Sequence, residues 1–248
     1  PRSGMMKRCI LLAYMAFAIA LPYACGQSVE YYFNQGLAKH SQKDYGGAIA
    51  DFTRAIELNP GNSVAYHCRG LSRLEAKDYK GAIKDFDKAI SINPGYEPSY
   101  FYRALAKHNQ GDYGNAVRDF TKALEFDAQK TETYFRRGAS RHQLRDYRGA
   151  IADFDRVIAD DGQRVEAFVS QAQSRYAMSD FHGAIFDLDA ALSLDASNAE
   201  AFYLRGMAKI RAGKLYDGCD DLRQADLLGH PETKNLIRDY CNLPEPQK

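Results

Sequence analysis

The stretch KDYGGAIADFTRAIELNPGN at residues 43–62 returns as KDYKGAIKDFDKAISINPGY at residues 77–96. The copies start 34 residues apart, and self-similarity at a fixed period of this length is typical of proteins built from stacked repeats. Both copies close on Asn-Pro-Gly, which ends a helix because proline lacks an N–H and keeps the preceding residue out of the helical region. This stretch therefore predicts a helical repeat.

Six units of 34 residues follow one another without an insertion. Position 4 of the unit is aromatic throughout, position 8 is Gly or Ala, position 20 is Ala or Gly, and position 24 is Phe or Leu. Positions 4 and 8 share one face of a helix, as do positions 17, 20, 24 and 27, so each unit is predicted to be two amphipathic helices joined by a turn. The units span residues 29–62, 63–96, 97–130, 131–164, 165–198 and 199–232.

This pattern resembles the tetratricopeptide repeat, whose period is 34 residues. The resemblance covers residues 29–232 and implies an all-α fold, a right-handed α-solenoid of six helix–turn–helix repeats with a concave inner face. Residues 233–243 are predicted to form a short capping helix, because the last repeat has no neighbour to cover its apolar face. Residues 244–248 are expected to be a tail.

Charged residues also recur in register. Position 23 is Asp in all six units, position 11 is Lys or Arg in all six, and position 7 is Arg in four and Gln in two. This arrangement predicts ion pairs between the two helices of a unit. The alternative is a charged groove that binds the carboxylate of a peptide.

The first 26 residues have the features of a secretory signal. Lys7 and Arg8 precede an uncharged run over residues 9–21, which is too short to predict a membrane-spanning helix. Cleavage before Gln27 would release the chain, whereas cleavage before Cys25, as in bacterial lipoproteins, would leave an acylated Cys25 that anchors it to a membrane. Both routes predict export, to the periplasm or a membrane-anchored place in the envelope of a double-membraned bacterium.

Two cysteines near the C-terminus form a candidate pair. Cys219 lies on the last second helix, and Cys241 lies on the predicted capping helix that should pack against it. In an exported protein the two could form a disulfide that clamps the cap, and the alternative is a pair of buried thiols.

The inner face of the solenoid is the candidate partner groove. In this architecture positions 2, 5, 9 and 12 of the first helices point inward, and in units one to four they are largely aromatic and aliphatic with His beside them. An exposed apolar strip marks a partner site, although these side chains could instead pack against neighbouring first helices. The predicted groove residues are Phe33, Leu37, His40, His67, Leu71, Phe101, Leu105, His108, Phe135, His142 and Tyr203.

Three of these histidines, His40, His108 and His142, share position 12. A metal ion would need ligands about 2 Å away, and neighbouring first helices are about 8–10 Å apart. Leu74 also interrupts the row in the second unit. Solvated groove histidines are therefore predicted, with no metal site.

No catalytic motif stands out: the sequence has no glycine-rich phosphate loop, no H-E-x-x-H and no G-x-S-x-G. The net charge of +1 without a basic run gives no support for nucleic-acid binding. The prediction is a non-enzymatic protein–protein interaction scaffold, without a cofactor, that binds a peptide or helix in its groove. The alternatives are a structural subunit that oligomerises through its convex face or edges and, third, an enzyme or cofactor-binding protein.

Overall fold

The computed structural model describes residues 28–127 and 129–241, and within these ranges it holds thirteen α-helices and no strand. The predicted signal, Cys25 and the C-terminal tail lie outside the described residues. Twelve of the helices form six pairs, and one more helix follows them. The pairs are α2 (Val29–Ser41) with α3 (Tyr45–Leu58), α4 (Ser63–Glu75) with α5 (Tyr79–Ile92), α6 (Glu97–Asn109) with α7 (Tyr113–Phe126), α8 (Thr131–Gln143) with α9 (Tyr147–Asp160), α10 (Val165–Ala177) with α11 (Phe181–Leu194), and α12 (Ala199–Arg211) with α13 (Leu215–Leu227), followed by α14 (Thr233–Tyr240).

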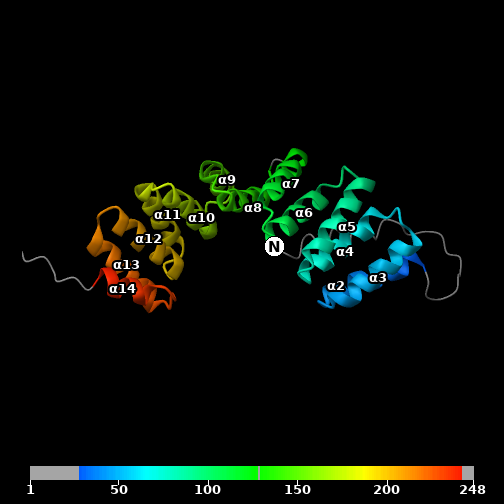
Figure 1. Cartoon of the computed structure of the whole chain (residues 1–248), viewed down its shortest axis with the longest axis horizontal. Coiled ribbons are helices and arrows are strands. Elements are labelled where there is room, and N and C mark those ends of the chain that lie inside the picture. The colour runs from blue at the N-terminus through cyan, green and yellow to red at the C-terminus, as the bar shows by residue number, and fades with distance from the viewer. Residues whose placement is uncertain (1–27, 128, 242–248) are drawn as a thin grey trace, which may run out of the picture.

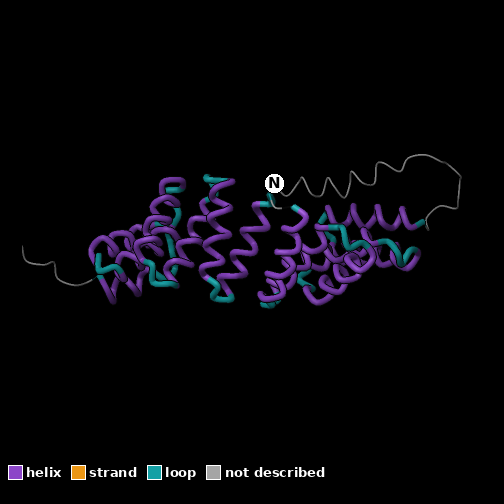
Figure 2. The backbone as a smooth tube through the Cα atoms, turned by 90° about the horizontal axis from the view of Figure 1, so that it is seen from above, coloured by secondary structure: helices purple, strands orange, loops and turns teal. Residues whose placement is uncertain are grey.

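The pairs stack into a curved solenoid (Figure 1). Each helix packs against the next one in the chain, and α14 packs against α13. In Figure 1 the first helices α6, α8 and α10 lie toward the inside of the arch, with α7 and α9 toward the outside. Figure 2 shows the pairs following one another along the long axis of the molecule. The predicted all-α solenoid with a capping helix is confirmed. Among the described residues, no helix has both the length and the apolar character needed to cross a membrane.

The turn within each of the first five pairs is built from two recurring positions. The first adopts a positive φ, 64° at Lys43 and 88° at Gly111, which reverses the chain at the end of the first helix. The second is an aspartate that caps the second helix, as in Asp44, whose carboxylate accepts a hydrogen bond from the Gly47 N–H at 2.9 Å. The KDY and GDY segments therefore encode the tight turn that lets the two helices lie antiparallel.

The core of each pair is one large side chain under a small residue. Phe52, Phe86, Phe120 and Phe154 are fully buried. A Cβ built on Gly36 would lie 2.7 Å from the Phe52 ring, which is closer than carbon atoms approach in proteins. The small residue at position 8 is therefore what allows the ring at position 24 to lie between the two helices.

Ion clusters join the two helices of a pair, as the charged positions predict. Arg69 donates two hydrogen bonds to the Asp85 carboxylate, at 2.9 and 2.7 Å, and Arg73 donates a third at 2.8 Å. Asp85 is buried, so this cluster belongs to the helix interface and is closed to a ligand. Equivalent clusters form around Asp119 (Arg103 and Lys107), Asp153 (Arg137 and Arg141) and Asp221 (Arg205 and Lys209).

Two of these arginines also tie their pair to the one before it. Arg103 on α6 reaches Asp87 on α5 at 2.6 Å, and Arg205 on α12 reaches Asp189 on α11 at 2.6 Å. One guanidinium thus bridges three helices, which fixes both the geometry within a repeat and the stacking between repeats.

Candidate functional site

The candidate site is the inner wall of the solenoid, built by the first helix of each pair. Positions 2, 5, 9 and 12 are spaced three or four residues apart and so form one stripe along each first helix. On α2 the stripe is Glu30, Phe33, Leu37 and His40, and on α8 it is Glu132, Phe135, Ala139 and His142. Acidic side chains thus lie at the start of these stripes and histidines lie at the end, with apolar groups between them.

The aromatic groups of the wall are shared with the core. Phe33, Phe101 and Phe135 are half-buried, and their ring centroids lie 5.6–5.8 Å from Phe52, Phe120 and Phe154 respectively. One face of the Phe135 ring is further covered by Arg164, whose guanidinium lies 4.0 Å from the ring centroid. These rings offer part of their surface to a ligand and use the rest to hold the repeat together.

The leucines of the wall are half-buried as well. Leu37 packs against the core around Phe52, and Leu71 and Leu105 pack against the core around Phe86. By contrast, the most exposed large apolar side chains of the described chain lie on second helices, with Phe186 at 72% and Leu227 at 79% exposure. The inner wall is therefore less open than its apolar sequence suggests.

Two predicted groove residues differ from expectation. His67 is only 2% exposed, with Nδ1 3.0 Å from the Ser99 hydroxyl and its ring edge-on to Tyr96 and Tyr102, so the prediction that it lines an open groove is wrong. Burial lowers the pKa of His67 to about 3. Tyr203 is covered by the chain itself.

The cover over Tyr203 comes from the segment before α14. The His230 ring stacks on Tyr203 with centroids 4.2 Å apart, and the Tyr203 hydroxyl donates to Glu232 at 2.9 Å. His230 in turn lies 3.0 Å from Glu200. Burial, together with the bond to Glu232, raises the pKa of Tyr203 to about 12. The last stripe of the wall is thus occupied by the chain's own residues.

The three histidines at position 12 are half-buried at the joints between repeats, where freely solvated rings were predicted. Each ring has Nδ1 within 2.8–2.9 Å of a serine hydroxyl on the next first helix. Each also lies edge-on to the tyrosine that starts the second helix of its own repeat. Burial is the main cause that lowers the pKa of all three histidines. The pairs are His40 with Ser72, His108 with Ser140, and His142 with Ser174.

These serines are the part of the site that sequence reasoning missed, although a signal was present. Position 10 of the following unit is Ser wherever position 12 is His, and it is Ala wherever position 12 is Leu74 or Tyr176. The substitutions change together across the joint because the two side chains meet there. Reading positions 12 and 10 as a pair, 32 residues apart, would have predicted the contact.

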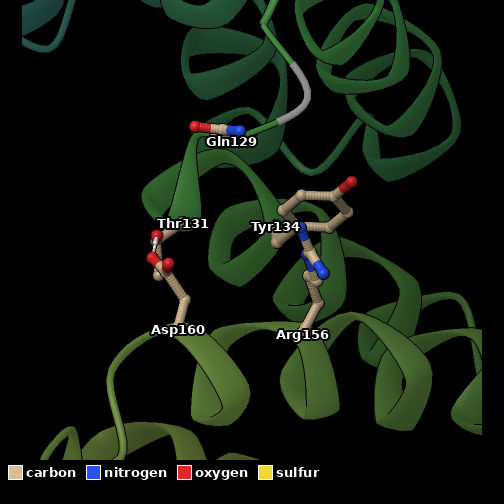
Figure 3. A pocket seen from close by; sticks show the side chains of 5 residues that line it. All are labelled: Gln129, Thr131, Tyr134, Arg156 and Asp160. Carbon is tan, nitrogen blue, oxygen red and sulfur yellow. Dashed lines mark hydrogen bonds between the residues drawn. The ribbon is translucent and has the colours of Figure 1, made fainter.

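The described residues contain no cluster of three or more His, Cys, Asp or Glu side chains placed to hold a metal ion. A small surface pocket of about 200 Å³ lies beside the loop between α7 and α8 (Figure 3). It is lined by Gln129, Thr131, Tyr134, Arg156 and Asp160, and Thr131 donates a hydrogen bond to Asp160 across it. This lining is polar, and the pocket is smaller than the sites that enclose small organic ligands.

Cys219 on α13 and Cys241, directly after α14, are joined by a disulfide, with Cα atoms 5.5 Å apart. The other cysteine within the described residues, Cys68, is a buried thiol. The disulfide therefore ties the far end of the capping helix back to the start of the helix that it covers.

Comparison with known proteins agrees with this architecture. Models of the tetratricopeptide repeat family match residues 29–62, 63–96 and 97–130. A search of curated proteins gives no match. Similar solved structures include YrrB, a TPR protein with an unusual peptide-binding site (19% identity, 76% of this chain and 97% of that chain, TM-score 0.66), and PilW, a type IV pilus biogenesis factor (18%, 86% and 100%, 0.69). The C-terminal part of a TPR repeat-containing protein from Cytophaga hutchinsonii is also similar (16%, 84% and 87%, 0.73).

The solved structures, all below 25% identity, establish the fold, and the three consecutive matches establish the repeat. Stacked repeats of this kind present extended surfaces to other proteins, and the pairs described here stack in this way. The chain belongs to the tetratricopeptide repeat family and is a protein-interaction scaffold.

Proposed function

We propose that this protein binds a peptide or helical segment of a partner along the inner wall of its solenoid. The observation that carries the proposal is the stripe of half-buried apolar side chains on α2, α4, α6 and α8, flanked by acidic groups and by imidazoles. A partner that covered Phe33, Leu37 or Phe101 would remove from water the apolar surface that these side chains still expose in the fold. YrrB, which shares the fold, is a TPR protein with a peptide-binding site.

We further propose that the chain is exported to the envelope of a double-membraned bacterium, either free in the periplasm or anchored through an acylated Cys25. The charged start and apolar run of residues 1–26 support export. The Cys219–Cys241 disulfide also favours an oxidising compartment. Mass spectrometry of the mature protein tests both points, because a chain that starts at Gln27 excludes the anchor and a retained residue 5 or 6 excludes cleavage.

The groove is tested by adding bulk to it without removing core contacts. Ala139 lies on the inner stripe of α8, and Ala152 is an exposed residue on α9 of the same repeat. Ala139→Arg is expected to abolish capture of a partner from an envelope extract, whereas Ala152→Arg should retain it. Both variants should keep the wild-type helical circular dichroism and melting temperature. Equal capture by the two variants would remove the groove from consideration.

A second candidate is assembly through the outer face. Phe186 on α11 and Leu227 at the end of α13 are 72% and 79% exposed, and a second copy that covered them would remove their apolar surface from water. Light scattering measures the mass of the particle in solution and so distinguishes this role. The double variant Phe186→Ser with Leu227→Ser should dissociate a self-assembled particle, whereas Ala139→Arg should leave its mass unchanged.

A further inference from the structure

The three histidine–serine pairs share a second contact that decides where the hydrogens lie. In each pair the serine hydroxyl oxygen lies 2.9–3.1 Å from the backbone carbonyl oxygen four residues earlier on its own helix. The serine oxygen is thus in hydrogen-bond contact with both a carbonyl oxygen and an imidazole nitrogen. The carbonyls belong to Cys68 for Ser72, to Arg136 for Ser140 and to Ser170 for Ser174.

A serine hydroxyl has one hydrogen to donate, and a carbonyl oxygen can only accept. If that hydrogen went to the imidazole, two oxygens would face each other at about 3 Å with no hydrogen between them, which is repulsive. If it goes to the carbonyl, the serine oxygen accepts from Nδ1–H and both contacts become hydrogen bonds. The joint therefore selects the Nδ1–H form of each histidine, and Nε2 carries a lone pair.

The Nε2 atoms of the three histidines are neither hydrogen-bonded nor fully buried. The described chain has four buried polar side-chain atoms without a hydrogen-bond partner, on Asp51, Glu97, Thr133 and Asp187, and no histidine nitrogen is among them. Within the same residues no side chain or backbone group bonds Nε2 of His40, His108 or His142. An unbonded Nε2 that is absent from this set is not fully buried, so the lone pair that the fold does not use remains accessible at position 12 of the inner stripe.

We infer that these three imidazoles are hydrogen-bond acceptors for a basic peptide segment, whose Lys or Arg side chains donate to Nε2 in the groove. This inference rests on the proposed groove function and adds the chemical class of the partner. A lone-pair acceptor attracts N–H donors and cations, and it repels carboxylates. The imidazole row would therefore distinguish a basic segment from an acidic one.

The charges around the groove favour the same class of partner. Glu30 and Glu166, at position 2 of α2 and α10, are exposed and form no ion pair within the described chain. At the other end of α2's stripe, Glu75 lies close enough to His40 for its negative charge to raise the pKa of the imidazole, against the larger effect of burial. A basic side chain between these carboxylates and the imidazoles would meet acceptors on both sides.

The remaining charged groups on the wall are already paired. Arg136 lies near His108 and lowers its pKa, but its guanidinium is held by Glu132 at 2.6 Å. Arg164 is bonded to the same Glu132 at 2.7 Å. Around His142 the contacts are Tyr147 and Ser174, both uncharged. Cations of the scaffold therefore do not compete for the imidazole acceptors.

Protonation should switch this recognition off without opening the joints. Acid adds a proton at Nε2, which turns the acceptor into a cationic donor, while Nδ1–H keeps its bond to serine. The pKa of each histidine is lowered by burial, so all three rings are neutral at pH 7.5. A basic segment should then bind at pH 7.5 and be released on acidification.

The tautomer is tested directly by NMR. Long-range ¹H–¹⁵N spectra of the full-length protein at pH 7.5 should show protonated Nδ1 and unprotonated Nε2 for three histidines, assigned by replacing each in turn with asparagine. Asparagine places an amide N–H near the position of Nδ1, so the bond to serine is retained while the Nε2 acceptor is removed. Protonated Nε2 in these rings would overturn the inference whatever the protein binds.

The partner class is tested with a phage-displayed library of random dodecapeptides selected at pH 7.5. Recovered peptides should be rich in Lys and Arg and should bind the H40N/H108N/H142N variant about tenfold more weakly than the wild type. As the pH is lowered, their affinity for the wild type should fall over the same pH range in which NMR shows the histidines taking up a proton. Peptides rich in Asp and Glu, or equal affinity for the variant, would overturn the inference while leaving the groove in place. Recovery of peptides that bind Ala139→Arg as well as wild type would instead count against the groove itself.

Discussion

The Nε atom of Arg175 lies 3.1 Å from the buried carboxylate of Asp187, and within the described chain no other cation is within ion-pair distance of that carboxylate. In four other repeats the equivalent aspartate also accepts two bonds from the arginine at position 7. Here position 7 is Gln171, whose amide donates to Asp155 at 2.6 Å. Burial outweighs the attraction of Arg175 and raises the pKa of Asp187 to about 7.

Asp187 should therefore make the stability of the fifth repeat depend on pH. Because its pKa in the fold exceeds the value of 3.8 for a free side chain, its contribution is full below pH 4 and is lost as the pH rises to about 7. Gln171→Arg should bond both Asp187 and Asp155, as Arg103 bonds its two aspartates, and raise the free energy of unfolding at pH 8 by ~1–2 kcal/mol. Urea unfolding at pH 5 and pH 8 measures this change.

A matched control exists in the sixth repeat. Arg205→Gln removes the arginine that bonds Asp221, so it should reproduce the defect of the fifth repeat and lower stability at pH 8 more than at pH 5. If Gln171→Arg were destabilising at pH 8, the assignment of Asp187 as an underpaired carboxylate would be incorrect.

His67 should make the protein sensitive to acid. Its pKa of about 3 lies below the unperturbed value of 6.5, so the unfolded chain takes up a proton that the fold rejects. The free energy of unfolding should fall by up to ~1.4 kcal/mol for each pH unit between 6.5 and 3. His67→Phe with Ser99→Ala should flatten this slope in urea titrations, because Phe33 and Ala65 occupy the equivalent positions at the joint between the first and second repeats. An unchanged slope would assign the acid sensitivity to other groups.

Gly70 should not tolerate a side chain. A Cβ at this position would lie 2.8 Å from the ring of Phe86, which is fully buried. Gly70→Ala should lower the free energy of unfolding by ~1–2 kcal/mol. Gly114, in the first turn of α7, has nothing within 4 Å of its Cβ position, so Gly114→Ala should be neutral or raise stability by up to ~1 kcal/mol. Thermal unfolding of the two variants compares them, and similar melting temperatures would contradict the packing argument.

The Cys219–Cys241 disulfide should hold the capping helix in place. It closes a sequence separation of 22 residues, for which the chain-entropy estimate is ~3 kcal/mol. Replacing both cysteines by serine should increase amide hydrogen exchange in α13 and α14, while α2 to α7 stay protected because each repeat contacts only its neighbours. Cys68→Ser serves as the control for loss of a thiol. Exchange rates in α14 that do not change would show that packing alone retains the cap.

The sequence predicted the ion clusters well because their members lie at fixed offsets in every repeat. Arg69 and Asp85 are 16 residues apart, and Arg137 and Asp153 repeat that offset. This offset recurs in four repeats, and the 12-residue offset from the cation at position 11 to the same aspartate recurs in all six. Both are visible in the sequence, since a solenoid makes its contacts between near neighbours in the chain. The candidate wall was predicted less well. His67 and Phe101 share position 5, yet one is buried and the other half-exposed.

The sequence alone determined the helical pairs, their turns and their order, because proline, N-capping aspartates and the 34-residue spacing of aromatic and small residues act within one repeat or between adjacent ones. Tertiary structure alone decided how much of the inner wall stays open. Exposure depends on how closely neighbouring first helices approach and on what folds over the end, as His230 does over Tyr203. The distance between neighbouring first helices results from many contacts across the joints, so no single position in the sequence determines it.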